Sequence, residues 1–206
     1  MEVIQDIKKG KLHSAYTIGA FDKAKEVLEK EGYRIISLEE QAGLRVQGGA
    51  DSSISRGGNW TKEGFIYVPT KGAFLTKVSP ITANAKQATD CHRDWGEFYL
   101  NDAQIEASLA DSVQIANTQI PTNRFADEAL TNFAFGKNAE AYGEFLGENG
   151  IDSIQVHLAG SQNEPFARQA WLYWIDCGGW SYLDGNGMDL YCGDFEVRGV
   201  REPGIK

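Results

Sequence analysis

The order of helices and strands that the hydrophobic pattern predicts constrains the fold more than any single motif does. The expected helices span residues 21–32, 103–115, 126–135 and 139–147, and the expected strands span 33–38, 65–68, 73–76, 154–158, 171–175 and 195–200. Helices and strands do not alternate one by one, as the crossovers of a parallel sheet require. The order therefore predicts an α+β fold.

A single domain over residues 1–206 accounts for the length of the chain. With 206 residues, 42% of them hydrophobic, the chain can bury a sizeable core. Its charged fraction of 24% is ordinary for a folded protein. No internal repeat and no low-complexity linker divides it.

The charge and the apolar runs narrow the possible partners and locations. A net charge of −9 with scattered Lys and Arg argues against a nucleic-acid partner, which requires clustered basic residues. No run of 18 apolar residues is present, and the N-terminus has no apolar signal segment. We therefore expect no membrane insertion, and a location in the cytoplasm or on a virion, with surface display by other means.

The familiar signatures of cofactor and metal binding are incomplete. The Gly-x-Gly at 185–187 lacks the third glycine of a dinucleotide-binding turn, and 184–189 departs from a calcium loop at two positions. The cysteines, Cys91, Cys177 and Cys192, fit neither a zinc site nor a disulfide framework. We expect no catalytic residue, no metal and no cofactor.

The histidines and a glycosylation sequon offer little more. His157 lies within an expected strand and is interpreted as a core or edge residue. Cys91 and His92 are adjacent, so their side chains point apart and cannot form a catalytic dyad directly. The sequon at 59–61 carries little weight without a secretory route.

The segment from Trp171 to Phe195 differs abruptly in composition from the rest of the chain. Its 25 residues include three Trp, three Tyr, five Gly and four Asp, and contain no Lys, Arg, Glu or Gln. Large amphipathic rings beside small adaptable residues are typical of binding surfaces. We therefore interpret the segment as a ligand-contacting surface, with Trp171, Leu172, Ile175 and Leu183 favoured as core residues.

The frame around this segment resembles the variable region of archaeal diversity-generating retroelement variable proteins. The matching residues are Pro165-Phe166-Ala167-Arg168-Gln169, Leu172, Ser181-x-Leu183-Asp184-Gly185-Asn186, Leu190 and Val197-Arg198-Gly199-Val200-Arg201-Glu202. In addition, Ser55-Arg56-Gly57-Gly58-Asn59-Trp60 resembles the Arg-Gly-Gly turn of the wider fold, which includes relatives of the formylglycine-generating enzyme. The close resemblance covers roughly the last 40 residues.

The resemblance implies a C-type lectin-like fold, with helices packed on small antiparallel sheets, and a variable region at 166–201. In that family an error-prone reverse transcriptase rewrites adenines in selected codons, and Asn codons then give Asp, Tyr, Ser, Gly, Cys or Phe but never Trp or Met. The residues that fit this rule are Tyr173, Asp176, Cys177, Gly178, Gly179, Tyr182, Gly187, Asp189, Tyr191, Cys192, Gly193, Asp194 and Phe195. Trp174 and Trp180 do not fit it but are interleaved with these residues, so we include them in the expected ligand-binding set; Met188 does not fit it either.

The implied function is non-catalytic binding of a ligand, with a protein on another cell or host surface as the expected partner. We expect an apolar frame of Trp171, Leu172, Leu183, Leu190, Val197 and Val200, braced by Arg198 and Arg201. Two alternatives stay open. One is an oxidase of the formylglycine-generating type that uses Cys177 and Cys192, and the other is a generic lectin-like binding module.

Overall fold

The computed structural model describes residues 1–8, 10, 12–160, 162–174, 180–187 and 189–203. The strands are β1 (Ile4–Ile7), β2 (His13–Ile18), β3 (Arg34–Ile35), β4 (Asn59–Val68), β5 (Gly72–Thr76), β6 (Phe98–Tyr99), β7 (Ser112–Ile115), β8 (Thr118–Pro121), β9 (Ser153–Leu158), β10 (Phe166–Trp174), β11 (Trp180–Gly185) and β12 (Glu196–Arg201). The helices are α1 (Phe21–Lys30), α2 (Leu38–Gly48), α3 (Ser53–Arg56), α4 (Pro80–Ala83), α5 (Ala85–Arg93), α6 (Asp102–Leu109), α7 (Ala129–Phe135) and α8 (Ala139–Glu148), with short 3-10 turns η1 (Thr122–Arg124), η2 (Gly136–Asn138) and η3 (Asp189–Tyr191).

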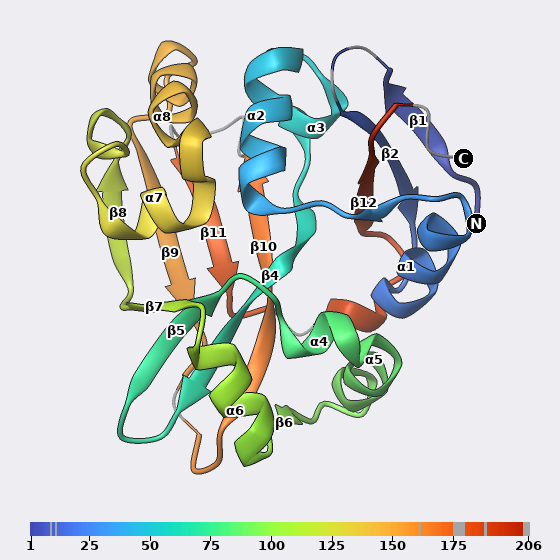
Figure 1. Ribbon diagram of the computed structural model, residues 1–206, viewed down its shortest axis with the longest axis vertical. Coiled ribbons are helices and arrows are strands. Elements are labelled where there is room, and N and C mark those ends of the chain that lie inside the picture. The colour runs from blue at the N-terminus through green and yellow to red at the C-terminus, as the bar shows by residue number, and fades with distance from the viewer. Residues whose placement is uncertain (9, 11, 161, 175–179, 188, 204–206) are drawn as a thin grey trace.

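One connected sheet runs through the molecule, in the order β1-β2-β12-β4-β10-β11-β9-β8 (Figure 1). The α+β class agrees with the expectation, but the expected small antiparallel sheets are joined into a single mixed one. Strand β11 returns antiparallel to β10 and inserts between β10 and β9, so it runs parallel to β9. Strands β12 and β4 also pair in parallel.

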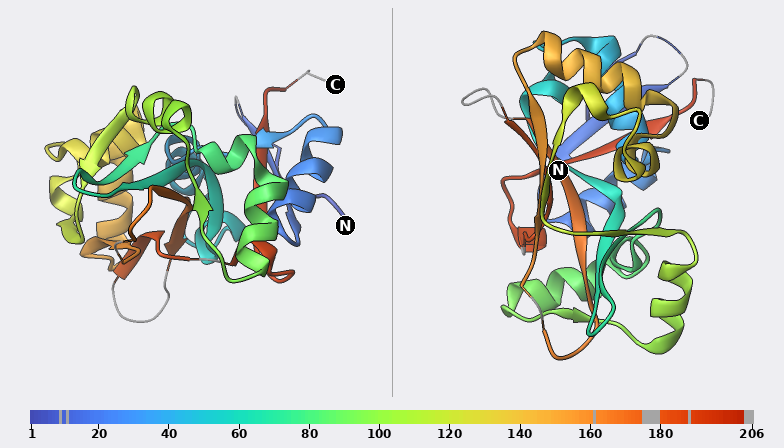
Figure 2. Two further views of the ribbon diagram at one scale, coloured as in Figure 1. Left: turned by 90° about the horizontal axis from the view of Figure 1, so that it is seen from below. Right: turned by 90° about the vertical axis from the view of Figure 1, so that its left-hand side faces the viewer.

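Helices lie on both sides of this sheet and enclose two main cores. Leu172, Leu183 and Phe65 pack with residues of α2, α7 and α8 in the first core. Trp60 and Val197 pack with residues of α1, α4 and α5 in the second. In the right-hand view of Figure 2, α7 and α8 (yellow) lie on one side of the strands and η3 (red) lies on the other.

Several elements differ from the sequence-based expectation. The helix expected at 103–115 ends at Leu109, and Val113 instead pairs with Leu75 as β7 joins the edge of β5. The strand expected at 33–38 is short, because a capping box at Ser37 and Glu40 starts α2 there. Strands β1 and β2 were not expected at all.

Candidate functional site

Strands β9, β10 and β11 present two different faces. Successive residues of a strand point to opposite sides, so alternate positions share a face. Leu172 and Leu183 pair across β10 and β11 and are 0% and 1% exposed, within the core beneath α7 and α8. The burial expected for these two residues is confirmed.

The opposite face of these strands holds a shallow hollow of about 250 Å³, which we call the aromatic hollow. Its lining residues are His157, Trp171, Tyr173, Tyr182 and Asp184. They form a grid, because His157, Asp184 and Trp171 pair across the three strands in one row, and Tyr182 and Tyr173 pair in the next. Three strands that follow one another in the chain, within residues 153–185, therefore build one small site.

Contacts within the aromatic hollow fix several of its walls. The His157 ring meets the Tyr182 ring edge-on, with centroids 4.7 Å apart, and its Nε2 lies 3.2 Å from Oε1 of Gln155. The Asn186 backbone N–H donates to Oδ1 of Asp184 over 2.6 Å. Tyr173 is 37% exposed, so its side chain projects into solvent.

Trp171 forms the side of the hollow next to β4, and it is half-buried rather than fully buried. Its ring packs edge-on against Trp60 at 4.6 Å and Phe195 at 5.0 Å between centroids. A Cβ atom on Gly58 would lie 2.2 Å from the Trp171 indole nitrogen, so only glycine fits there. The Arg-Gly-Gly turn thus makes room for an aromatic residue at the site.

The segment after β11 contributes a second exposed region. Asp189, Gly193 and Asp194 are exposed, whereas Gly187, Tyr191, Cys192 and Phe195 are half-buried. Tyr191 contacts Trp95, which follows α5, with ring centroids 6.2 Å apart. Trp95 is 77% exposed, and the sequence-based interpretation did not include it.

Four positions of the expected site, Asp176, Cys177, Gly178 and Gly179, lie outside the described residues. So do Met188 and Ile175, the latter expected in the core. Trp174 is the last residue of β10 and Trp180 the first of β11. Of the expected site residues, Tyr173 and Tyr182 lie side by side in the hollow. Tyr191 and Cys192 lie outside the hollow, in the segment after β11.

Two arginines of β12, Arg198 and Arg201, brace the scaffold next to this surface. Arg198, fully buried, pairs with Asp6 and Glu196 and donates to Oδ1 of Asn59 over 3.3 Å. Burial alone would raise the pKa of Asp6, but Arg198 and the hydroxyls of two serines bring it below its ordinary value. Arg201 donates to the Glu31 carbonyl over 3.0 Å. The expected bracing roles of Arg198 and Arg201 are confirmed.

Two further arginines support the site itself. Arg168 forms a two-pronged ion pair with Glu97 and donates to the Asn186 carbonyl over 2.9 Å. Arg45 is fully buried and donates to the carbonyls of Gly57 and Leu172 over 2.9 and 3.2 Å. These contacts fix the chain two residues after Asp184 and one residue after Trp171.

Other features of the sequence have structural explanations. Asn59 of the glycosylation sequon is fully buried, so a glycan at that position does not fit the folded protein. The side chain of His157 is exposed and does not lie in the core. In the described part of the chain, no group of three or more His, Cys, Asp or Glu side chains is arranged to hold a metal ion.

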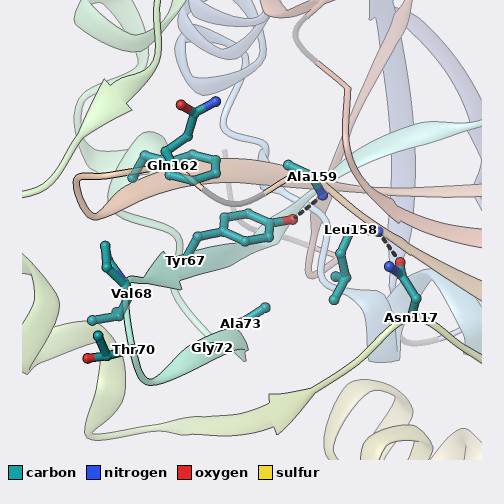
Figure 3. Close-up of a pocket in the computed structure, with 11 residues that line it drawn as sticks. Tyr67, Val68, Thr70, Gly72, Ala73, Asn117, Leu158, Ala159 and Gln162 are labelled. Carbon is teal, nitrogen blue, oxygen red and sulfur yellow. Dashed lines mark hydrogen bonds between the residues drawn. The ribbon is translucent and has the colours of Figure 1, made fainter.

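A second hollow, of about 270 Å³, lies where the β4–β5 hairpin meets the end of β9 (Figure 3). Two of its polar side chains, Tyr67 and Asn117, hold the chain in place. The Tyr67 hydroxyl donates to the Gly185 carbonyl over 2.8 Å and accepts from the Ala159 N–H, and Asn117 accepts from the Leu158 N–H. The aromatic hollow, whose groups face solvent, is the better candidate site.

The chain is similar in fold to a known protein. No protein-family model matches it, and no curated protein is similar to it in sequence. A solved structure superimposes on this chain with a TM-score of 0.67 at 17% sequence identity. Its description is "Accommodation of massive sequence variation in Nanoarchaeota by the C-type lectin fold". The match covers 96% of this chain and 100% of the other. The chain therefore has the C-type lectin fold, as expected.

Among the described residues, no helix combines the length and apolar character needed to cross a bilayer.

Proposed function

We propose that this protein is a non-catalytic ligand-binding protein whose binding surface is rewritten by a diversity-generating retroelement. The proposed variable surface comprises the replaceable positions on the open face of β10 and β11, Tyr173 and Tyr182 among them, and the segment that ends at Phe195. Trp171 and Asp184 on the same face belong to the constant frame. Its partner is a protein on another cell or host surface.

The alternation of residues along β10 and β11 carries this proposal. Leu172 and Leu183 belong to the core, whereas their neighbours Tyr173 and Tyr182 line a hollow open to solvent. Substitutions at exposed positions usually change stability by no more than about 0.5 kcal/mol. A surface of this design accepts many side chains without loss of the fold. The solved structure of the same fold, described as accommodating massive sequence variation, lends support.

Replacing Tyr173, Tyr182 and Tyr191 with Ala in one variant tests the surface. We expect the variant to keep its far-UV and near-UV circular dichroism and to unfold cooperatively in urea. The Leu183→Ala variant is the matched control and should be clearly destabilised. If the triple variant is unfolded, these tyrosines belong to the scaffold and the proposal is wrong for them.

The gene neighbourhood tests the retroelement. We expect a template repeat that differs from the codons for residues 170–201 almost only at adenines, beside a reverse-transcriptase gene. Absence of both from a complete genome would leave a generic binding module on the C-type lectin fold.

A further inference from the structure

The aromatic hollow combines three aromatic rings with one carboxylate. Trp171, Tyr173 and Tyr182 supply the rings, and Asp184 supplies the charge. The faces of aromatic rings attract cations within about 6 Å of their centroids, and a nearby carboxylate adds a direct attraction. These are the components of a site for an organic cation.

The charges around the hollow also favour a cationic ligand. None of its lining residues is Lys or Arg. The whole segment from Trp171 to Phe195 contains four Asp and neither Lys nor Arg, in a chain of net charge −9. An incoming cation therefore meets no repulsive side chain within this segment, and the overall field favours its approach.

The size of the hollow limits the ligand to one head group. A volume of about 250 Å³ is smaller than the pockets that hold drug-sized ligands, which start near 300 Å³. A guanidinium, an ammonium or a trimethylammonium group on a flexible stem fits this description. The remainder of a larger ligand would lie over the neighbouring exposed face.

We propose that the aromatic hollow binds a cationic head group, such as the end of an Arg or Lys side chain of the protein ligand. This inference rests on the proposed function and deepens it. Under that proposal, Trp171 and Asp184 belong to the constant frame, while Tyr173 and Tyr182 are replaceable. The frame then supplies a lasting preference for positive charge, and the two tyrosines adjust how tightly a particular cation is held.

Two residues outside the expected variable set, Trp171 and Asp184, thus become specificity-determining. Asp184 and Trp171 pair directly across β11 and β10, and His157 pairs with Asp184 on the other side. The Asn186 N–H donates to Oδ1 of Asp184, and the Asp184 side chain is half-exposed where it lines the hollow. The carboxylate is therefore accessible to a ligand from the open side.

Choline and its uncharged carbon isostere, in which a quaternary carbon replaces the nitrogen, are the probes. We expect choline to bind at millimolar concentration, with upfield shifts of its methyl protons and amide shifts at residues 157, 171 and 182–184 in NMR spectra. The isostere should bind at least about fivefold more weakly, because it lacks the cation–π attraction. Equal binding of the two probes would show an apolar hollow and overturn the inference.

Two variants identify the groups responsible. Asp184→Asn should weaken choline binding about threefold to tenfold, and Tyr182→Leu by a similar factor, with the fold intact. Tyr99→Ala removes a half-exposed ring on β6 that does not line the hollow, and it should leave binding unchanged. Unchanged binding in Asp184→Asn, or no choline binding to the wild type, contradicts the cation site. Neither result affects the tolerance of the tyrosine triple variant, which tests the proposed function separately.

Discussion

The two faces of strands β9, β10 and β11 are made from alternate residues of the same segments, but their constraints are opposite. On the core face, Leu172 and Leu183 pack in the core beneath α7 and α8 and are almost fully buried. On the open face, Tyr173 and Tyr182 have solvent on one side. A two-residue period therefore lets one strand serve stability and the proposed binding with separate sets of residues.

The faces also differ in how they carry charge. On the open face, Asp184 is half-exposed, so water and any bound cation can compensate it. On the core side, Glu63 of β4 is buried, and one of its oxygens accepts from the Leu38 N–H at the start of α2. Its other oxygen has no hydrogen-bond partner among the described residues. An ionised Glu63 therefore costs more folding free energy than an ionised Asp184.

Leu172→Ala should give the largest effect. We expect a loss of about 4 kcal/mol in the free energy of unfolding, because the fully buried side chain leaves a cavity. Gln41 and Arg45 both donate to the Leu172 carbonyl, which hinders collapse of the strand into that cavity. Urea denaturation measures the loss.

Tyr173→Ala is the matched comparison, one residue along the same strand. It should change the free energy of unfolding by less than about 1 kcal/mol. Equal losses in the two variants would mean that the two faces are not independent.

Sequence patterns revealed the two faces well, because alternation is local. The sequence separated buried Leu172 from exposed Tyr173, but it also placed Trp171 in the core, whereas Trp171 is half-buried and lines the open face. The sequence also predicted α1, α8 and the α6 capping box at Asn101, whose signals lie within one or two turns.

What the sequence did not reveal depends on long-range packing. The face of α2 that is buried includes Gln41 and Arg45, so an apolar stripe is missing. In β2, buried Ser14 and Thr17 hide the strand in the same way. The place of His157 beside Asp184 follows from the parallel pairing of β9 with β11, which no local pattern specifies.

Glu63→Gln tests the charge difference between the faces through pH. Burial raises the pKa of Glu63 to about 7, although the Leu38 N–H and the positive charges of Lys62 and Lys77 act to lower it. In the unfolded chain this carboxyl ionises near its ordinary value of 4.5. Between these pH values the unfolded state has lost a proton that the folded state keeps. Glu63 therefore reduces stability as the pH rises from 4.5 to 7, by as much as about 3 kcal/mol.

The Gln variant should lose this dependence. Its stability relative to the wild type should rise over that pH window and level off above it, as measured by urea denaturation at a series of pH values. Glu144→Gln, an exposed position on α8, is the control and should follow the wild type. A constant difference between wild type and Glu63→Gln across the window would contradict a buried, protonated carboxyl.

The smallest effect concerns the outer limit of the open face, at Trp95. This residue has a positive φ of 59° and an exposed ring that contacts Tyr191, so its backbone strain is not offset by burial. Trp95→Gly relieves about 1 kcal/mol of backbone strain, which stabilises the fold. It also loses the ring contact with Tyr191, which costs about as much. The net change in the free energy of unfolding should therefore be below about 1 kcal/mol. Trp95→Ala loses the ring but keeps the strain, so it should be less stable than Trp95→Gly by about 1 kcal/mol in urea denaturation. If the two variants are equally stable, the backbone at this position is not strained. Trp95 would then carry no backbone cost, and its ring contact with Tyr191 would be its main contribution beside the proposed binding surface.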